Sequence, residues 1–272
     1  MFGFLRRRRQ NRIRSRPFPA GWRDILQRRY TLYSRLPAAD RRELEGWIRV
    51  FLAEKRFEGC GGQEITDEVR VLVAAQACLL LLHRATDCYP RLRSILVYPS
   101  SYLAKTQRQR PDGTVAEWHQ PRGGESWHHG AVVLAWDGAF AGAVESDKDR
   151  NLVLHEFAHQ LDEEDGVADG APLLEGATFS GTLRRYRAWA RVLSKEFQML
   201  RRAAEAGQET VLDTYGAQNP AEFFAVATEC FFERPKRLQE RHPALYAELK
   251  EFYRQDPIRY ETARPETDEP PT

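Results

Sequence analysis

The segment Leu154-His155-Glu156-Phe157-Ala158-His159-Gln160-Leu161-Asp162 carries the pattern HExxH. On a helix, two histidines four residues apart share one face, so both imidazoles reach one zinc ion. Glu156 lies beside them, placed to act as a base toward water at that metal. Because HExxH fixes only three of five residues, the pattern also arises by chance. The other positions here are mostly apolar, as a buried active-site helix requires, so we expect a zinc-binding helix from residue 151 to about residue 163.

The third zinc ligand has to come from elsewhere in the chain. A catalytic zinc keeps three protein ligands and one open position. The extended pattern HExxHxxGxxH is absent, because Asp165 stands where its last histidine would be. The best candidate is Glu222, since Asn219 is a helix cap and Pro220 a favoured first residue. Glu222 then falls in the first turn of a helix that is otherwise apolar, where a carboxylate favours a cation as its partner.

Three other acids stay open as the third ligand. Glu229 lies two turns beyond Glu222, about 10 Å along the helix axis, so one zinc cannot bind both. If it is not the ligand, Glu229 is a surface acid or supports a ligand. Asp213 would make an aspartate-type site, and Glu175, in a loop-like stretch, is the weakest of the four.

Further side chains near these motifs are candidates for supporting roles. Tyr215, seven residues before Glu222, is expected to donate a hydrogen bond to the oxyanion that forms when water attacks a carbonyl; the alternative is an ordinary packed tyrosine. Asp162 is expected either to orient a ligand histidine or to be a helix-end acid. Three histidines are expected at the rim of the site and not around a second metal: His119, His128 and His129.

Around this centre the chain is mostly helical. Helical spacing covers these ranges: 22–60 (as two helices), 66–84, 180–206, 220–234 and 243–253. Two short apolar runs, residues 95–98 and 130–136, predict a small sheet, and we expect the second run to offer its edge to an extended peptide. The predicted fold class is therefore α+β: a mostly helical, zincin-like metallopeptidase with a small mixed sheet beside the HExxH helix.

The ends of the chain differ from its middle. Residues 1–19 hold seven arginines, no acid and two prolines, and are expected to form a disordered basic arm that is either solvated or in contact with phosphate or a membrane surface. Residues 262–272 are expected to form a disordered acidic, proline-rich tail. Between them we expect a single domain, residues 20–261, with a helical N-terminal part (20–90) and a catalytic part (91–261).

Composition excludes several classes of protein. A chain of 272 residues that is 42% hydrophobic is long and apolar enough for a sizeable core. Subtracting the seven charges of the arm from the net +2 leaves −5 for residues 17–272, so a basic footprint for nucleic acid is absent. The longest apolar run is too short to span a bilayer. The four cysteines are widely spaced and form no CxxC pair, which favours a reducing, cytoplasmic location.

Three segments together bring the sequence close to a known family: Val132-Val133-Leu134-Ala135-Trp136, the HExxH segment 154–162, and Tyr215-Gly216-Ala217-Gln218-Asn219-Pro220-Ala221-Glu222-Phe223-Phe224-Ala225-Val226. In this order they resemble the Mlc titration factor A family of bacterial zinc peptidases, from about residue 22 to residue 259. That family's catalytic core is similar to the peptidase domain of anthrax lethal factor.

The resemblance implies a gluzincin-like site with one zinc per chain. His155, His159 and Glu222 would be the ligands, Glu156 the general base and Tyr215 a group near the oxyanion. It also implies a cytoplasmic protein with aminopeptidase-like activity on peptides, which binds the glucose-responsive repressor Mlc. Direct binding to nucleic acid or to a membrane is not expected. The basic arm and the acidic tail have no counterpart in the family pattern.

A second class of function competes with catalysis. A non-catalytic, zinc-stabilised regulatory protein that sequesters a transcription factor would carry the same ligands, but it would not need Glu156 as a base. A third class, nucleic-acid binding through the arginines of residues 6–16, predicts an affinity that falls as salt rises.

Overall fold

Helices make up most of the fold. A computed structural model describes residues 2–109, 115–122, 124–127, 130–145, 150–174 and 179–262. The α-helices are α1 (Phe2–Arg14), α2 (Ala20–Arg29), α3 (Thr31–Arg35), α4 (Ala38–Glu54), α5 (Asp67–Leu79), α6 (Trp136–Val144), α7 (Leu152–Asp162), α8 (Phe179–Glu205), α9 (Pro220–Glu233), α10 (Pro235–Arg241), α11 (Pro243–Tyr253) and α12 (Ile258–Thr262). Two short 3₁₀ helices, η1 (Glu163–Asp165) and η2 (Thr214–Ala217), flank the helices that carry the predicted ligands.

The strands form one mixed sheet and one hairpin. They are β1 (Arg56–Gly59), β2 (Ser94–Tyr98), β3 (Tyr102–Gln109), β4 (Val115–Arg122), β5 (Gly124–Trp127) and β6 (Ala131–Ala135). The sheet has the order β1-β2-β6-β5, in which β1, β2 and β6 are parallel and β5 runs antiparallel to β6. Ile95 of β2 pairs with Phe57 on one side and with Val132 on the other. The antiparallel pair β3–β4 forms the hairpin.

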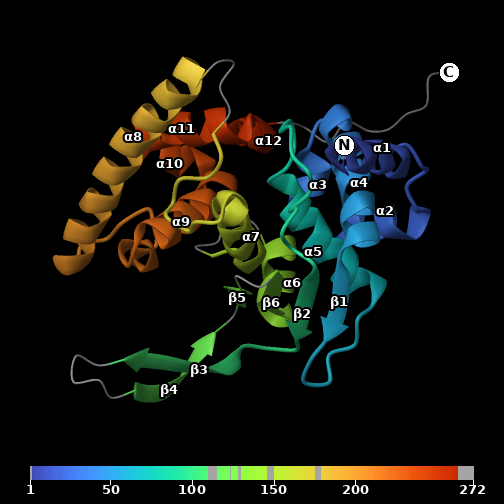
Figure 1. The fold of residues 1–272 in the computed structure, drawn as a ribbon, viewed down its shortest axis with the longest axis horizontal. Coiled ribbons are helices and arrows are strands. Elements are labelled where there is room, and N and C mark those ends of the chain that lie inside the picture. Colours follow the sequence, from blue (N-terminus) through green and yellow to red (C-terminus); the bar gives the residue numbers. More distant parts are fainter. Residues whose placement is uncertain are drawn as a thin grey trace.

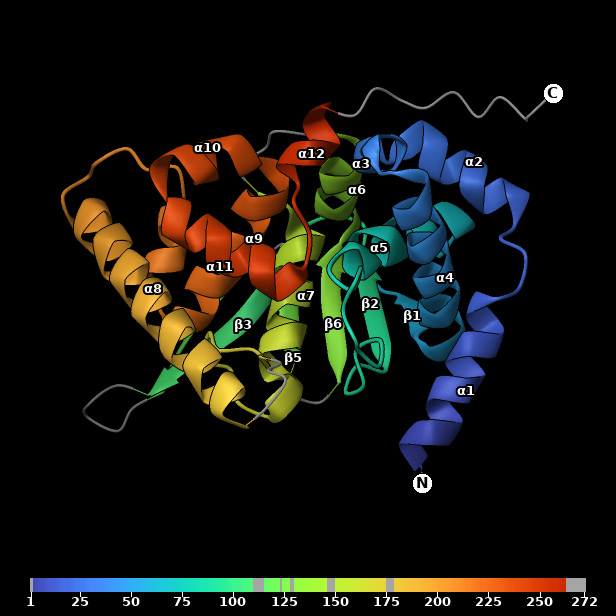
Figure 2. The same ribbon diagram turned by 90° about the horizontal axis from the view of Figure 1, so that it is seen from above.

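The sheet and α7 lie between two groups of helices. Figures 1 and 2 show the N-terminal helices (blue) on one side and the C-terminal helices α8 to α11 (yellow to red) on the other. This arrangement confirms the predicted α+β class, mostly helical with a small mixed sheet beside the HExxH helix. The division of the domain at residue 90 stays a prediction.

The buried face of α7 anchors it in the core. Phe157 is fully buried, and its ring centroid lies 5.6 Å from that of Phe51 in α4 and 4.9 Å from that of Tyr89. Phe157 lies two residues from each histidine of the motif, so it projects from roughly the opposite face of the helix. Packing of the N-terminal half of the chain against Phe157 therefore turns His155 and His159 away from that core.

The expected disorder of residues 1–19 is wrong, because residues 2–14 form α1 and this helix packs on α4. Arg6 bonds to Glu54 Oε2 at 3.1 Å and to the Asp87 carbonyl at 3.0 Å, and Ile13 is buried. Arginine is a good helix former. The two acceptors of Arg6, the Glu54 carboxylate and the Asp87 carbonyl, lie 48 and 81 residues away in the sequence, so a local pattern of charge does not reveal them.

Other boundaries also differ from expectation. The helix expected over residues 66–84 ends at Leu79, and residues 80–84 turn, with His83 in a left-handed backbone conformation (φ 61°). The polar stretch that follows β2 contains β3, β4 and β5, and α6 and α10 were not predicted. The predicted tail lies, apart from Thr262, outside the described residues.

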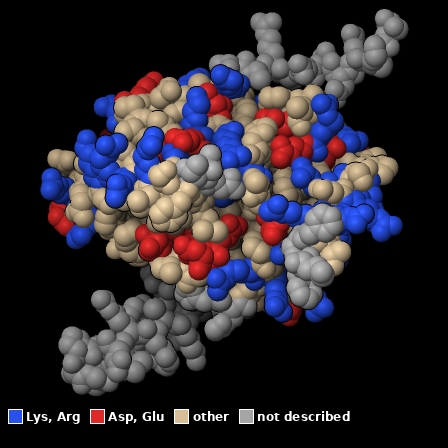
Figure 3. Space-filling model, turned by 45° about the horizontal axis from the view of Figure 1, so that its top comes forward, with Lys and Arg blue, Asp and Glu red and all other residues tan. Residues whose placement is uncertain are grey.

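Charge is spread unevenly over the surface. Figure 3 shows Lys and Arg side chains gathered on the left, where α8 lies in Figure 1, and on the right, where the N-terminal helices lie. Acidic side chains gather nearer the middle of this face. None of the described helices combines the length and the apolar character needed to cross a membrane.

Candidate metal centre

Helix α7 presents two histidines to a shared space. The helix begins at an N-cap, Asn151, whose side chain accepts a hydrogen bond from Leu154 N at 3.0 Å. His155 and His159 lie one turn apart, with ring centroids 4.9 Å apart and Nε2 atoms 3.2 Å apart. The helix therefore begins at residue 151, as the sequence predicts.

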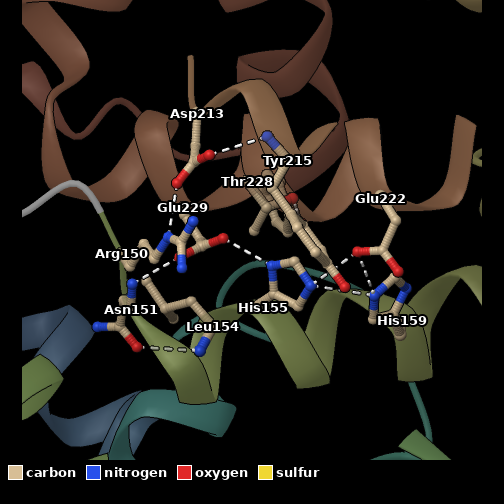
Figure 4. Close-up of polar contacts among 11 residues, drawn as sticks. Arg150, Asn151, Leu154, His155, His159, Asp213, Tyr215, Glu222, Thr228 and Glu229 are labelled. Atoms are coloured by element: carbon tan, nitrogen blue, oxygen red, sulfur yellow. Dashed lines mark hydrogen bonds and ion pairs between the residues drawn. The ribbon is translucent and has the colours of Figure 1, made fainter. Parts of the chain in front are cut away.

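Helix α9 brings Glu222 to the same space. Asn219 caps this helix by accepting from Glu222 N at 2.9 Å, and Pro220 occupies its first turn, as its sequence predicts. Packing of α9 against α7 then places Glu222 Oε2 3.0 Å from His155 Nε2 and 3.5 Å from His159 Nε2. Figure 4 shows the three side chains converging from the two helices.

The donor set fits zinc. The three ligand atoms lie within 4.8 Å of one another, and this is the one such group of metal-ligating side chains found among the described residues. Two ligands of a tetrahedral zinc with bonds of about 2.0–2.1 Å are about 3.3 Å apart, close to the 3.0, 3.2 and 3.5 Å between these atoms. Two imidazole nitrogens and a carboxylate oxygen are also the kind of donors that a catalytic zinc takes.

Glu222 is ionised in this site. Burial alone would raise its pKa, but hydrogen bonds from His155 and His159 outweigh burial and hold the pKa of Glu222 at about 2. A carboxylate that is charged at neutral pH is ready to bind a cation. The candidate that the sequence favoured as third ligand is thus the acid that the fold brings to both histidines.

Glu229 lies on the other side of His155. Its Oε1 is 2.6 Å from His155 Nδ1, and its Oε2 accepts from the backbone N of Asn151 at 2.6 Å (Figure 4). With a metal bound in place of the Nε2 proton, a carboxylate at Nδ1 would keep Nδ1 protonated and leave Nε2 as the ligand atom. Glu229 is therefore placed to orient a proposed ligand, which the sequence left open as the alternative to a surface acid.

Asp213 is not part of the group formed by the two histidines and Glu222, and it organises η2. It accepts from Tyr215 N at 2.8 Å and pairs with Arg150 Nε at 2.5 Å. Tyr215 is 41% exposed, and its ring centroid lies 5.9 Å from that of His155. Figure 4 shows the phenol extending from η2 toward His155. Asp213 thus positions Tyr215, and the sequence missed Arg150, for which no motif gave a signal.

Glu156 and Asp162 are both buried. Burial raises the pKa of Glu156 to about 7, although the neighbouring His155 and His159 act to lower it. Asp162 Oδ2 accepts from Gly170 N at 2.9 Å, so Asp162 holds the loop that follows α7. The role of orienting a ligand histidine, considered for Asp162, is filled at His155 by Glu229.

Other candidates are only partly visible. Glu175, His128 and His129 lie outside the described residues, and His119 lies in β4. The strand that precedes α6 is not the edge expected from the sequence, because β6 is paired on both sides, with β2 and with β5. The two edge strands among the described residues are β1 and β5, and β5, next to β6, is the one that contacts α7.

Comparison with known proteins gives consistent matches over nearly the whole chain. The model of the glucose-regulated metallo-peptidase M90 family matches residues 4–254, which includes most of α1. An uncharacterized protein of Synechocystis sp. is 42% identical over 253 residues, covering 92% of this chain and 89% of its own. Mlc titration factor A of Pectobacterium atrosepticum is 32% identical, covering 76% of each chain, and that of Klebsiella pneumoniae is 30% identical, covering 82% of each chain.

Proposed function

Because the chain belongs to the glucose-regulated metallo-peptidase M90 family, we propose that it is a zinc-dependent, aminopeptidase-like peptidase. The observation that supports this most is the convergence of His155, His159 and Glu222 within 4.8 Å, with Glu156 buried on the same helix as the histidines. In this proposal the three residues hold one zinc ion per chain. Bound there, zinc would polarise a carbonyl and lower the pKa of a water to about 7.

Glu156 and Tyr215 take the remaining chemical roles. Glu156 removes a proton from the attacking water and returns it to the leaving amine. A base with a pKa of about 7 exchanges protons readily near neutral pH. Tyr215, held by the Asp213 contact to its backbone, donates a hydrogen bond to the oxyanion.

The substrate is proposed to be a peptide or protein segment in extended form. The β5 strand lies at the edge of the sheet and contacts α7, so a peptide backbone added along β5 would pass beside the helix that carries the histidines. In this proposal the edge that receives the peptide is β5, and not residues 130–136 as the sequence predicts.

A regulatory role is the second part of the proposal. Several relatives are named Mlc titration factor A, and we propose that this chain likewise binds a repressor of that kind. The competing class, a non-catalytic regulatory protein stabilised by zinc, would keep the ligands but would not need Glu156. We also propose a cytoplasmic location, which the four free cysteines support.

The test is Glu156→Gln, with Glu209→Gln, an exposed acid on the surface, as the matched control. We expect Glu156→Gln to retain zinc, measured by elemental analysis, and to lose peptide hydrolysis by about a hundredfold or more. The control should keep both. Hydrolysis by Glu156→Gln at the parental rate would refute the peptidase mechanism. Repressor binding, measured in parallel by pull-down, is expected to be unchanged in both variants.

A further inference from the structure

A polar cavity lies away from the proposed metal centre. It has a volume of about 110 Å³ and lies between α8, α11, the turn after α5 and the loop before residue 175. A single water needs roughly 10–15 Å³ measured in this way, so the cavity has room for a polyatomic ion. Its lining contains Arg84, Arg185 and Arg254, and none of His155, His159 or Glu222.

One N–H donor of Arg84, a residue that lines this cavity, lacks a hydrogen-bond acceptor. Its Nη1 is buried and has no hydrogen-bond partner. Its guanidinium stacks over the ring of Phe252, with Cζ 4.2 Å from the centroid, and this contact fixes the plane of the group. A buried, unsatisfied donor on a charged group is costly, so the site favours an anion that would accept from Nη1.

Arg254 reaches the cavity from an unusual backbone position. It is the C-cap of α11 in the left-handed region (φ 54°), where glycine is the favoured residue and a side chain is strained. Its Nη1 donates to the His83 carbonyl at 3.3 Å. An arginine at this strained position indicates that its side chain has a function.

Arg185 pairs with two glutamates whose side chains differ in their exposure to solvent. It lies 3.5 Å from Glu248 and also pairs with Glu251. The side chain of Glu251 is 60% exposed, and ion pairs at the surface are worth at most about 1 kcal/mol. An incoming anion can therefore displace Glu251 from Arg185. Among the described residues that line the cavity, three are arginines and one, Glu251, is an acid.

We propose that this cavity binds a small oxyanion of the phosphate class, either inorganic phosphate or the phosphate group of a monoester. The planar guanidinium groups offer paired N–H donors that match phosphate oxygens, and a spherical ion such as chloride cannot use them in the same way. In the bound state the oxygens of the anion accept from the guanidinium groups of Arg84, Arg254 and Arg185, the last in place of Glu251.

Binding at this place is coupled to folding. Phe252, beneath Arg84, packs with Phe224 of α9 and Trp189 of α8, at centroid distances of 5.7 and 5.4 Å. An anion bound over Phe252 would tie together elements that separate on unfolding, so it would raise the melting temperature as well as release heat on titration.

The experiment titrates inorganic phosphate into the full-length protein by calorimetry at constant ionic strength, with chloride as the reference ion. Phosphate should bind at one saturable site. Arg84→Met, which keeps an apolar side chain over Phe252, should weaken binding by about tenfold or more. Glu251→Gln, which removes the competing acid, should strengthen it. Arg187→Met, an exposed arginine in the same helix as Arg185, should bind like the parent.

The result is decisive in both directions. Absence of saturable binding, equal binding of chloride, or equal phosphate affinity in the parent and Arg84→Met would overturn the proposal; the last outcome would place phosphate elsewhere, for example at the metal centre. If Arg84→Met does not fold, Arg254→Gln takes its place and should also weaken binding. Glycerol phosphate should compete with inorganic phosphate, and whichever binds more tightly identifies the source. Failure to compete would also count against the proposal.

Discussion

Glu229→Gln gives the sharpest test of how the metal centre is held. The Glu229 side chain is 5% exposed, and its two oxygens serve two donors, His155 Nδ1 and Asn151 N, each at 2.6 Å. Glutamine has nearly the same shape but only one acceptor oxygen, so one of these donors would face an NH₂ group. A lost hydrogen bond to a charged group is worth about 1.5–3 kcal/mol.

That energy predicts the size of the effect. When the hydrogen bond to His155 Nδ1 is lost, the ring is no longer held with Nε2 toward His159 and Glu222, and its basicity falls. We expect zinc affinity to decrease by about 10- to 100-fold, the range that 1.5–3 kcal/mol implies and that outer partners of zinc ligands typically show. Glu222→Ala, which removes a proposed ligand, should lower it further.

Zinc dissociation constants measured by competition with a chelator would give the answer, together with circular dichroism to verify folding. The matched control is Glu233→Gln. Glu233 lies one turn further along α9 and accepts from the side chain of the same Asn151, at 2.8 Å. This variant should keep zinc affinity within a few-fold of the parent. A folded Glu229→Gln that binds zinc as tightly as the parent would refute an orienting role for Glu229.

Three further predictions address other parts of the chain. Tyr215→Phe should lower kcat by about tenfold or more with unchanged zinc content, because the proposed oxyanion contact is lost; an unchanged kcat in a peptide assay would make Tyr215 a packing residue. Burial raises the pKa of Asp162 to about 6, above its unfolded value of about 3.9, so ionisation above pH 6 opposes folding. In urea unfolding without metal, Asp162→Asn should therefore be more stable than the parent by about 2–3 kcal/mol at pH 7.5 and equal near pH 4, whereas a gap that does not vary with pH would contradict this. Arg6→Gln should lower the free energy of unfolding by about 1–2 kcal/mol if α1 is docked through Glu54, and equal stability would speak against that docking.

Much of the metal centre could be predicted because its geometry is local. The spacing of His155 and His159 follows from the period of one helix. The Asn219-Pro220 helix start likewise predicts, from local sequence alone, that Glu222 lies in a first turn. The choice between Glu222 and Glu229 could not be settled by that period alone. Both face α7, and only the packing of α9 on α7 decides that one reaches Nε2 of His155 and the other Nδ1.

The errors lie where distant residues decide the local structure. The arginines of α1 predict a solvated arm from the sequence alone, whereas in the fold Glu54 and Asp87 lie beside them and form ion pairs. The strand β6 is a strong apolar run, but which of its edges is covered depends on β5, a short polar segment that no pattern singled out. In the first case the partner residues lie far away in the sequence, and in the second the partner strand has no clear sequence pattern of its own.

The separation of the ligands along the chain has a consequence during synthesis. His155 and His159 leave the ribosome ahead of Glu222, which lies 67 residues after His155. At about 5–20 residues per second, the nascent chain carries two histidines without their carboxylate for roughly 3–13 seconds. Glu229, which orients His155, emerges later still. The nascent chain therefore offers a metal two of the three proposed ligands until α9 has been made and packed, so the complete proposed site can form only after α9 has joined α7.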